Sequence, residues 1–206
     1  MVRIRFDYFL WLAEQQAKKL DTTARPIYLS AYKQLADAYG IAAKDARETE
    51  ELDETDRSYQ LNWLKEEYQQ QRVALAAMTF ALLERTVNLH MRSMLGLVGN
   101  RFRHAPPPEK LHKIIVEYQS QFGIRVKGLL HYDTVREVVL ARNGALHTEG
   151  LPSADYMQQT EKRCLDELGY LNLTPELLDT FVEELKQFVT ELGQEMSEAT
   201  QRSKAN

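Results

Sequence analysis

The stretch that decides the fold is residues 57–95, RSYQLNWLKEEYQQQRVALAAMTFALLERTVNLHMRSML. Its large apolar side chains recur every three or four positions, the spacing that places side chains on one face of an α-helix. They are Leu61, Leu64, Tyr68, Leu75, Met78, Leu82 and Leu89. The spacing predicts one long amphipathic helix from about Arg57 to about Leu95.

The same helical period recurs on both sides of this stretch, and no convincing alternation predicts a strand. An apolar stripe from Phe6 to Leu20 predicts a first helix, and Pro26 predicts the start of a second that ends near Gly40. A further helix is expected at Leu111–Phe122, closed by Gly123, and another after a cap at Asp133. Two more are expected near the end of the chain. One runs from a cap at Ser153 to Leu168, and the last begins at the cap Thr174 with Pro175 at its first position.

These elements together predict an all-α protein. We expect an antiparallel four-helix bundle over residues 57–201, an N-terminal helical extension over residues 1–56 and a frayed polar tail over residues 202–206. Trp11 and Trp63 are interpreted as anchors of helix packing.

Composition narrows the class of protein further. The 206 residues carry a net charge of −4 and one cysteine, Cys164, which excludes an intramolecular disulfide and fits a reducing compartment. The apolar run Val73–Leu83 is too short to cross a membrane, and no signal peptide is recognised. We expect a soluble cytoplasmic protein in which Cys164 is a half-buried small residue rather than a nucleophile.

Charge is distributed unevenly along the chain. Acidic residues crowd residues 45–56 and 161–198, whereas the middle of the chain is basic. Such a basic patch inside an acidic protein predicts a face that binds a polyanion, although solvated helix faces are the alternative. We assign RNA contacts to Arg101, Arg103, Lys110, Lys113, Arg125 and Lys127.

The most informative segment is residues 135–147, VREVVLARNGALH. Asn143 directly follows Arg142, and His147 lies five positions after the arginine. We call Arg142, Asn143 and His147 the motif. An apolar helix leads into it, a Gly/Pro loop follows it, and a long amphipathic helix closes the chain. This arrangement resembles the Arg-x4–6-His motif of the HEPN superfamily of small helical bundles.

The bare spacing occurs elsewhere in the chain. Arg85 and His90 fit it, and Arg125 and His131 fit its looser form. The asparagine after the arginine and the late position in the bundle favour the motif. Arg85 and His90 lie midway along a predicted helix, where residues five apart point roughly 140° away from each other. We interpret them as a surface arginine and a partly buried histidine.

The HEPN resemblance implies a function. Many members are metal-independent ribonucleases of toxin–antitoxin and antiviral defence systems, which implies catalytic roles for the motif, a homodimer, and an antitoxin or defence-system protein as partner. In one toxin subgroup, a tyrosine two residues beyond the histidine receives nucleotides from a partner transferase. Glu149 stands there in this chain, so that regulation is not expected.

The residue types of the motif also suit RNA cleavage. A histidine that titrates near neutral pH can act as base or acid. A guanidinium matches two phosphate oxygens and stays charged, and Asn143 can orient either partner or donate to the phosphate. One chain supplies only one such set, so we expect two copies around a twofold axis to complete the site.

Other chemistries have weaker signals. A di-iron bundle needs two Glu-x-x-His pairs, and only Glu109 with His112 fits this pattern. Zinc motifs and Gly-rich phosphate loops are absent from the sequence, so no metal or cofactor is assigned.

An alternative interpretation of the motif is structural: Arg142 holds a loop carbonyl, and His147 complements the charge of a helix end. The protein would then be a non-catalytic helical adaptor for a protein partner, or a regulator that binds a small ligand or nucleotide.

Overall fold

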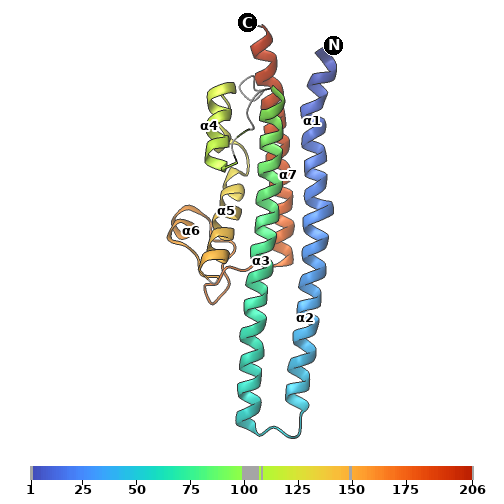
Figure 1. Cartoon of the computed structure of the whole chain (residues 1–206), viewed down its shortest axis with the longest axis vertical. Coiled ribbons are helices and arrows are strands. Elements are labelled where there is room, and N and C mark those ends of the chain that lie inside the picture. The colour runs from blue at the N-terminus through green and yellow to red at the C-terminus, as the bar shows by residue number, and fades with distance from the viewer. Residues whose placement is uncertain (1, 99–106, 108, 149, 206) are drawn as a thin grey trace.

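The computed structural model describes residues 2–98, 107, 109–148 and 150–205. Within these ranges the chain forms the helices labelled α1 to α7 and no strand, and the helices pack side by side like a bundle (Figure 1). The predicted all-α class is therefore confirmed. No helix of the described ranges combines the length and the apolar composition needed to cross a membrane.

The first helical rod is longer than the sequence predicted. It joins α1 (Val2–Lys19), a π-helical turn at Leu20–Ala24 and α2 (Arg25–Glu48) without a break. The predicted helix start at Pro26 agrees to within one residue with the start of α2 at Arg25, although the π-turn keeps the rod continuous there. The predicted helix end near Gly40 is wrong, because α2 continues to Glu48. A proline inside a helix crowds the carbonyl four residues earlier, and the wider π-turn directly before Pro26 accommodates this crowding.

Two more long helices lie beside this rod. The predicted helix over residues 57–95 is confirmed as α3 (Glu54–Val98), and α7 (Pro175–Ala205) stays helical past Glu198. The start of α1 and the end of α7 lie at the same end of the molecule (Figure 1). Gly193 lets α7 approach α1 closely, because a Cβ at this position would lie 3.0 Å from the Cβ of Ala13.

One hydrophobic core connects these helices. Residues of the first rod, including Leu20 and Tyr28, belong to the same cluster as residues of α3 and α7. The largest buried side chains of α3 and α7 are Phe80, Leu83, Met91, Met94, Leu95, Phe181 and Phe188.

The interpretation of Trp11 and Trp63 as packing anchors is wrong, because their exposed fractions are 49% and 60%. Trp63 lies in the first three turns of α3. Figure 1 shows that, beyond the start of α7, α2 and this part of α3 continue as a two-helix arm without a third helix to cover them. Ile41 and Tyr59 are also exposed on this arm.

Shorter helices pack on one side of α3. They are α4 (Leu111–Phe122), a 3-10 turn at Val126–Gly128, α5 (Tyr132–His147) and α6 (Ala154–Gln159). Gly123 ends α4 in the left-handed conformation, as predicted. Asp133 does not cap α5, because the helix begins after His131, which adopts the left-handed conformation without a side-chain cap.

The two remaining caps are confirmed. Ser153 Oγ accepts the Tyr156 N–H at 3.1 Å at the start of α6, and Thr174 Oγ1 accepts the Leu177 N–H at 3.2 Å at the start of α7. The helix after Ser153 ends at Gln159, so the predicted helix end at Leu168 is wrong. The segment between α6 and α7 instead has an irregular backbone.

His90 provides a test of this packing. It is fully buried on α3, and burial lowers the pKa of its imidazole to about 4. In the unfolded chain the ring binds a proton below about pH 6.5. The free energy of unfolding therefore has its full value above pH 6.5. It decreases by up to about 3 kcal/mol as the pH falls from 6.5 toward 4. Chemical denaturation of His90→Met across this range should show a correspondingly weaker pH dependence.

His112 on α4 is exposed and serves as the matched control. His112→Met should keep the pH dependence of the unchanged protein. An identical pH dependence in His90→Met and the unchanged protein would show that His90 is not buried in this way.

Candidate functional site

The motif lies in the last two turns of α5, as expected for a motif near a helix end. Arg142 Nη1 donates to Asn143 Oδ1 at 2.9 Å. Arg142 Nε lies 3.7 Å from Glu84 Oε2 on α3, which is an ion pair but too long for a hydrogen bond. His147 is the last residue of the helix and is exposed.

Within one chain, Arg142 and His147 do not converge. Both are helical and five positions apart, so their side chains point roughly 140° away from each other. The angle that separates Arg85 from His90 therefore also separates Arg142 from His147. Burial distinguishes the two histidines instead, because His90 is enclosed in the core and His147 is open to solvent.

His147 lies on the wall of an open groove of about 1710 Å³. The groove lies between the lower half of α3, the end of α5 and residues 163–174 of the segment that precedes α7. Polar and aromatic residues form much of its lining. They include Asn62, Lys65, Gln70, Tyr170 and Asn172.

Arg163 holds the far wall of this groove in place. Its backbone N–H and its Nε donate to the two carboxylate oxygens of Glu137 on α5, each at 2.8 Å. Its Nη1 donates to both oxygens of Glu184 on α7, at 2.8 and 3.0 Å. Its guanidinium also lies 4.6 Å from the ring centre of Phe181. The single side chain thus links the irregular segment to two helices.

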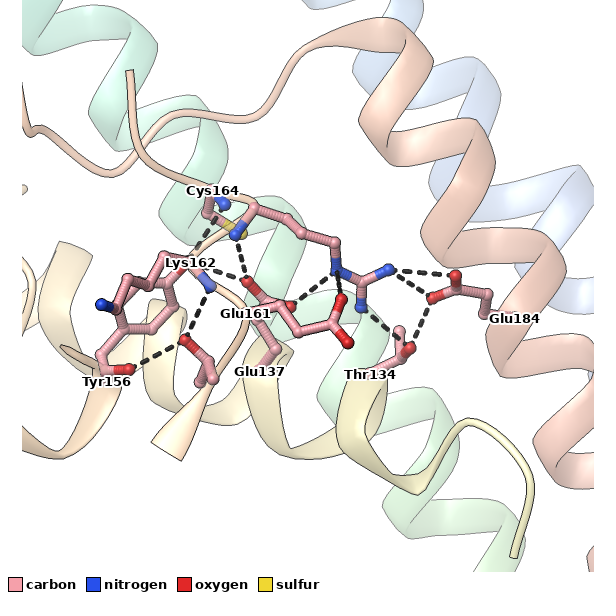
Figure 2. A network of polar contacts seen from close by, with 9 residues as sticks. Thr134, Glu137, Tyr156, Glu161, Lys162, Cys164 and Glu184 are labelled. Carbon is pink, nitrogen blue, oxygen red and sulfur yellow. Dashed lines mark hydrogen bonds and ion pairs between the residues drawn. The ribbon is translucent and has the colours of Figure 1, made fainter. Parts of the chain in front are cut away.

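Tyr156 completes this polar network (Figure 2). Its hydroxyl donates to Glu137 Oε1 at 2.9 Å and accepts the backbone N–H of Cys164 at 3.0 Å. Cys164 is buried, rather than half-buried as predicted, and burial raises the pKa of its thiol. A protonated, enclosed thiol cannot act as a nucleophile.

Gly144, inside the motif segment, allows the same irregular segment to approach α5. A Cβ there would lie 2.5 Å from Leu171 Cδ1 and 3.0 Å from the carbonyl oxygen of Leu151. Leu171 is fully buried, so it has little room to move away. The glycine is therefore needed for close contact between α5 and the groove wall.

The predicted RNA-binding residues lie away from the groove. Lys110 and Lys113 are exposed at the start of α4, and Arg125 and Lys127 are exposed around the 3-10 turn. That turn precedes α5, whose 16 residues place His147 about 22 Å further along the helix axis. The structure thus separates these four cations from the motif histidine. Arg101, Arg103 and Glu149 lie outside the described residues.

Sequence reasoning missed the groove residues. Lys65 and Arg72 are seven positions apart and therefore share a face of α3, which is a detectable signal. Nothing in the sequence connects that face to Tyr170 or Asn172, about a hundred positions away, because packing alone brings them together. Among the described residues, no group of three His, Cys, Asp or Glu side chains could hold a metal ion.

Comparison of the chain with family models, with curated proteins and with solved structures found no match. The HEPN resemblance therefore depends on the motif and its setting in the chain.

The Arg163 network makes a stability prediction. Glu137 is 1% exposed, so Arg163→Met would leave a buried carboxylate without its cation. We expect a loss of roughly 3–5 kcal/mol in the free energy of unfolding. Urea denaturation measures it. Lys186→Met is the control: Lys186 pairs with Asp21 at 2.8 Å near the surface, and we expect a loss of at most about 1 kcal/mol. Equal losses in the two variants would contradict a stabilising role for the buried network.

Proposed function

We propose that this chain is a dimeric, HEPN-type, RNA-binding protein that cleaves RNA without a metal ion. The observation that carries the proposal is the motif itself: an exposed histidine at the end of α5, five residues after an arginine that is hydrogen-bonded by the following asparagine. On this proposal, residues 57–201 form the antiparallel four-helix HEPN-like unit, to which the first rod is added.

The proposed reaction uses the RNA's own 2′-hydroxyl. Its oxygen attacks the adjacent phosphorus while a base takes its proton, the bond from phosphorus to the 5′-oxygen breaks, and an acid protonates that oxygen. The products are a 2′,3′-cyclic phosphate and a 5′-hydroxyl. His147 moves a proton, and Arg142 stabilises the negative charge on the phosphorane.

The contacts of Arg142 suit this role. Asn143 fixes one arm of the guanidinium, and Glu84 holds its position through the longer ion pair. Nη2 has no hydrogen-bond partner in the described part of the chain, so this arm is available to a phosphate oxygen.

The divergence of Arg142 and His147 favours a dimer. A second copy would supply the second histidine that an acid–base pair needs, and its arginine would approach from the opposite side. The cationic residues assigned to RNA, Lys110, Lys113, Arg125 and Lys127 with Arg101 and Arg103, would hold phosphates remote from the cut. A cytoplasmic location and an antitoxin or defence-system partner belong to the same proposal.

The cleavage experiment uses the purified full chain, single-stranded RNA and a chelator. We expect products that end in a 2′,3′-cyclic phosphate. Because each variant loses one catalytic group, His147→Ala should lower the rate by roughly 10²–10⁴. Arg142→Ala should be comparably damaging, with an unchanged helical circular dichroism signal.

His90→Met is the matched histidine control, and we expect it to cleave at the unchanged rate. Activity that survives both motif substitutions, or that requires a divalent ion, would contradict the proposed chemistry.

Assembly is tested separately. Light scattering at micromolar concentration should give the mass of a dimer, because a single chain cannot bring two histidines to one phosphate. A monomer whose mass is unchanged by added RNA would contradict the two-copy site.

The adaptor alternative is favoured by one observation. The arm formed by α2 and α3 exposes Ile41, Tyr59 and Trp63, which are large apolar side chains on a surface without a covering helix. Exposed aromatic residues are enriched where proteins bind one another. A protein without RNA cleavage, but with a partner that Trp63→Ala releases, would support this alternative.

A further inference from the structure

The residues that line the groove beside His147 fall into two sets. The first set is already engaged within the chain. Gln69 Nε2 donates to Asp166 Oδ2 at 3.0 Å and so ties α3 to the far wall. The ring of Tyr68 stacks on Tyr39 with centres 4.5 Å apart, and the guanidinium of Arg72 lies 5.5 Å from it. These contacts shape the groove.

The second set has free hydrogen-bonding groups. Across the described ranges, eight polar lining side chains make no hydrogen bond, ion pair or ring contact with another residue: Asn62, Lys65, Glu66, Gln70, His147, Glu167, Tyr170 and Asn172. Four of these eight carry an amide or a phenol group, and the others are Lys65, His147 and the two glutamates. The groove therefore offers free amide and hydroxyl groups to a ligand, beside charges of both signs.

Asn172 points most directly to a ligand. Its exposed fraction is only 8%, and its buried Oδ1 has no hydrogen-bond partner in the described part of the chain. A buried amide oxygen without a donor is costly in free energy and is rare in folded proteins. A ligand that donates a hydrogen bond to this oxygen would remove that cost.

Charge in the groove does not favour a run of phosphates. Its cationic residues are Lys65, Arg72, Arg163 and its acidic residues are Glu66, Asp166, Glu167, so the two signs balance. Arg163 is moreover fully occupied by Glu137 and Glu184. The ligand is therefore expected to be held by hydrogen bonds and stacking more than by net charge.

An unstacked nucleobase meets these requirements. Its flat face stacks on an aromatic ring, and its edge carries the donors and acceptors that side-chain amides recognise. Tyr170 supplies a half-buried ring for which no contact with another ring is present in the described ranges. Asn172 supplies a buried amide that can distinguish one base edge from another.

We infer that this groove is a base-binding subsite, in which Tyr170 stacks on one nucleobase of a single-stranded RNA and Asn172 recognises its edge. The inference rests on the proposed function, since it places the ribose and phosphate of that nucleotide toward His147. It adds a base preference at the cleavage site, which the motif alone does not supply.

The first experiment measures binding of the four nucleoside 5′-monophosphates and of ribose 5-phosphate to the full chain by calorimetry. At least one nucleotide should bind more tightly than ribose 5-phosphate, with little dependence on salt. Tyr170→Leu should weaken that binding roughly tenfold. Tyr170→Phe, which keeps the ring, should retain it.

Tyr59→Leu is the matched control, because Tyr59 is exposed and does not line the groove. It should bind nucleotides as the unchanged protein does. Asn172→Asp, which loses the amide donor, should change which base binds best; thermal melting checks that it folds. Equal affinity for ribose 5-phosphate and all four nucleotides, or equal effects of Tyr170→Leu and Tyr59→Leu, would overturn the inference.

Cleavage assays with the same variants distinguish its failure from failure of the proposed function. In one outcome, cleavage is lost in His147→Ala, but Tyr170→Leu and Asn172→Asp keep the KM and the base preference of the unchanged protein. This outcome would overturn the base-binding subsite and support the proposed ribonuclease. Nucleotide binding that needs Tyr170 in a protein that cleaves no RNA overturns the ribonuclease and makes the groove a site for a free nucleotide.

Discussion

The ion pair between Glu137 and Arg163 is the contact on which the site depends. Glu137 points from α5 into the interior, where a carboxylate without a partner would be strongly unfavourable. Arg163 neutralises it and simultaneously reaches Glu184 on α7. Because residues 160–174 have little regular structure, their position against α5 and α7 depends strongly on this one side chain. Without it, the segment would lose these charged links to α5 and α7 and would keep the bond from Gln69 to Asp166 and the packing of Leu171.

The helix α5 serves three purposes along its length. Glu137 faces the interior and anchors the segment, Arg142 meets Glu84 on α3, and His147 ends the helix at the groove. These directions follow from the helical period, since residues at different phases of a turn face different neighbours. Hence the same element that stabilises the fold also presents the residues proposed for chemistry.

The described cations assigned to RNA lie on a different surface from the groove at His147, and this arrangement bears on function. Lys110, Lys113, Arg125 and Lys127 are exposed around α4 and the following 3-10 turn, remote from His147, whereas the groove at His147 is balanced in charge and rich in amides. Long-range attraction to a polyanion and local recognition of a base would then come from different parts of the chain. A strand bound to both would have to extend along most of α5.

The sequence by itself determined the features that depend on near neighbours. The helical class, the long helix α3, the left-handed end at Gly123 and the caps at Ser153 and Thr174 all follow from residues within a few positions, because helical hydrogen bonds and caps are local. A local signal also misled: Gly40 resembles a helix end, but α2 continues to Glu48. Pro26 does lie at the start of α2, but the π-turn before it joins α2 to α1 in one rod. Only the tertiary structure decided that His90 is enclosed while Trp63 is exposed, that Glu137 needs Arg163, and that His147 shares a groove with Tyr170 and Asn172. Those outcomes depend on which helix covers which face, and that is set by the packing of residues far apart in the chain.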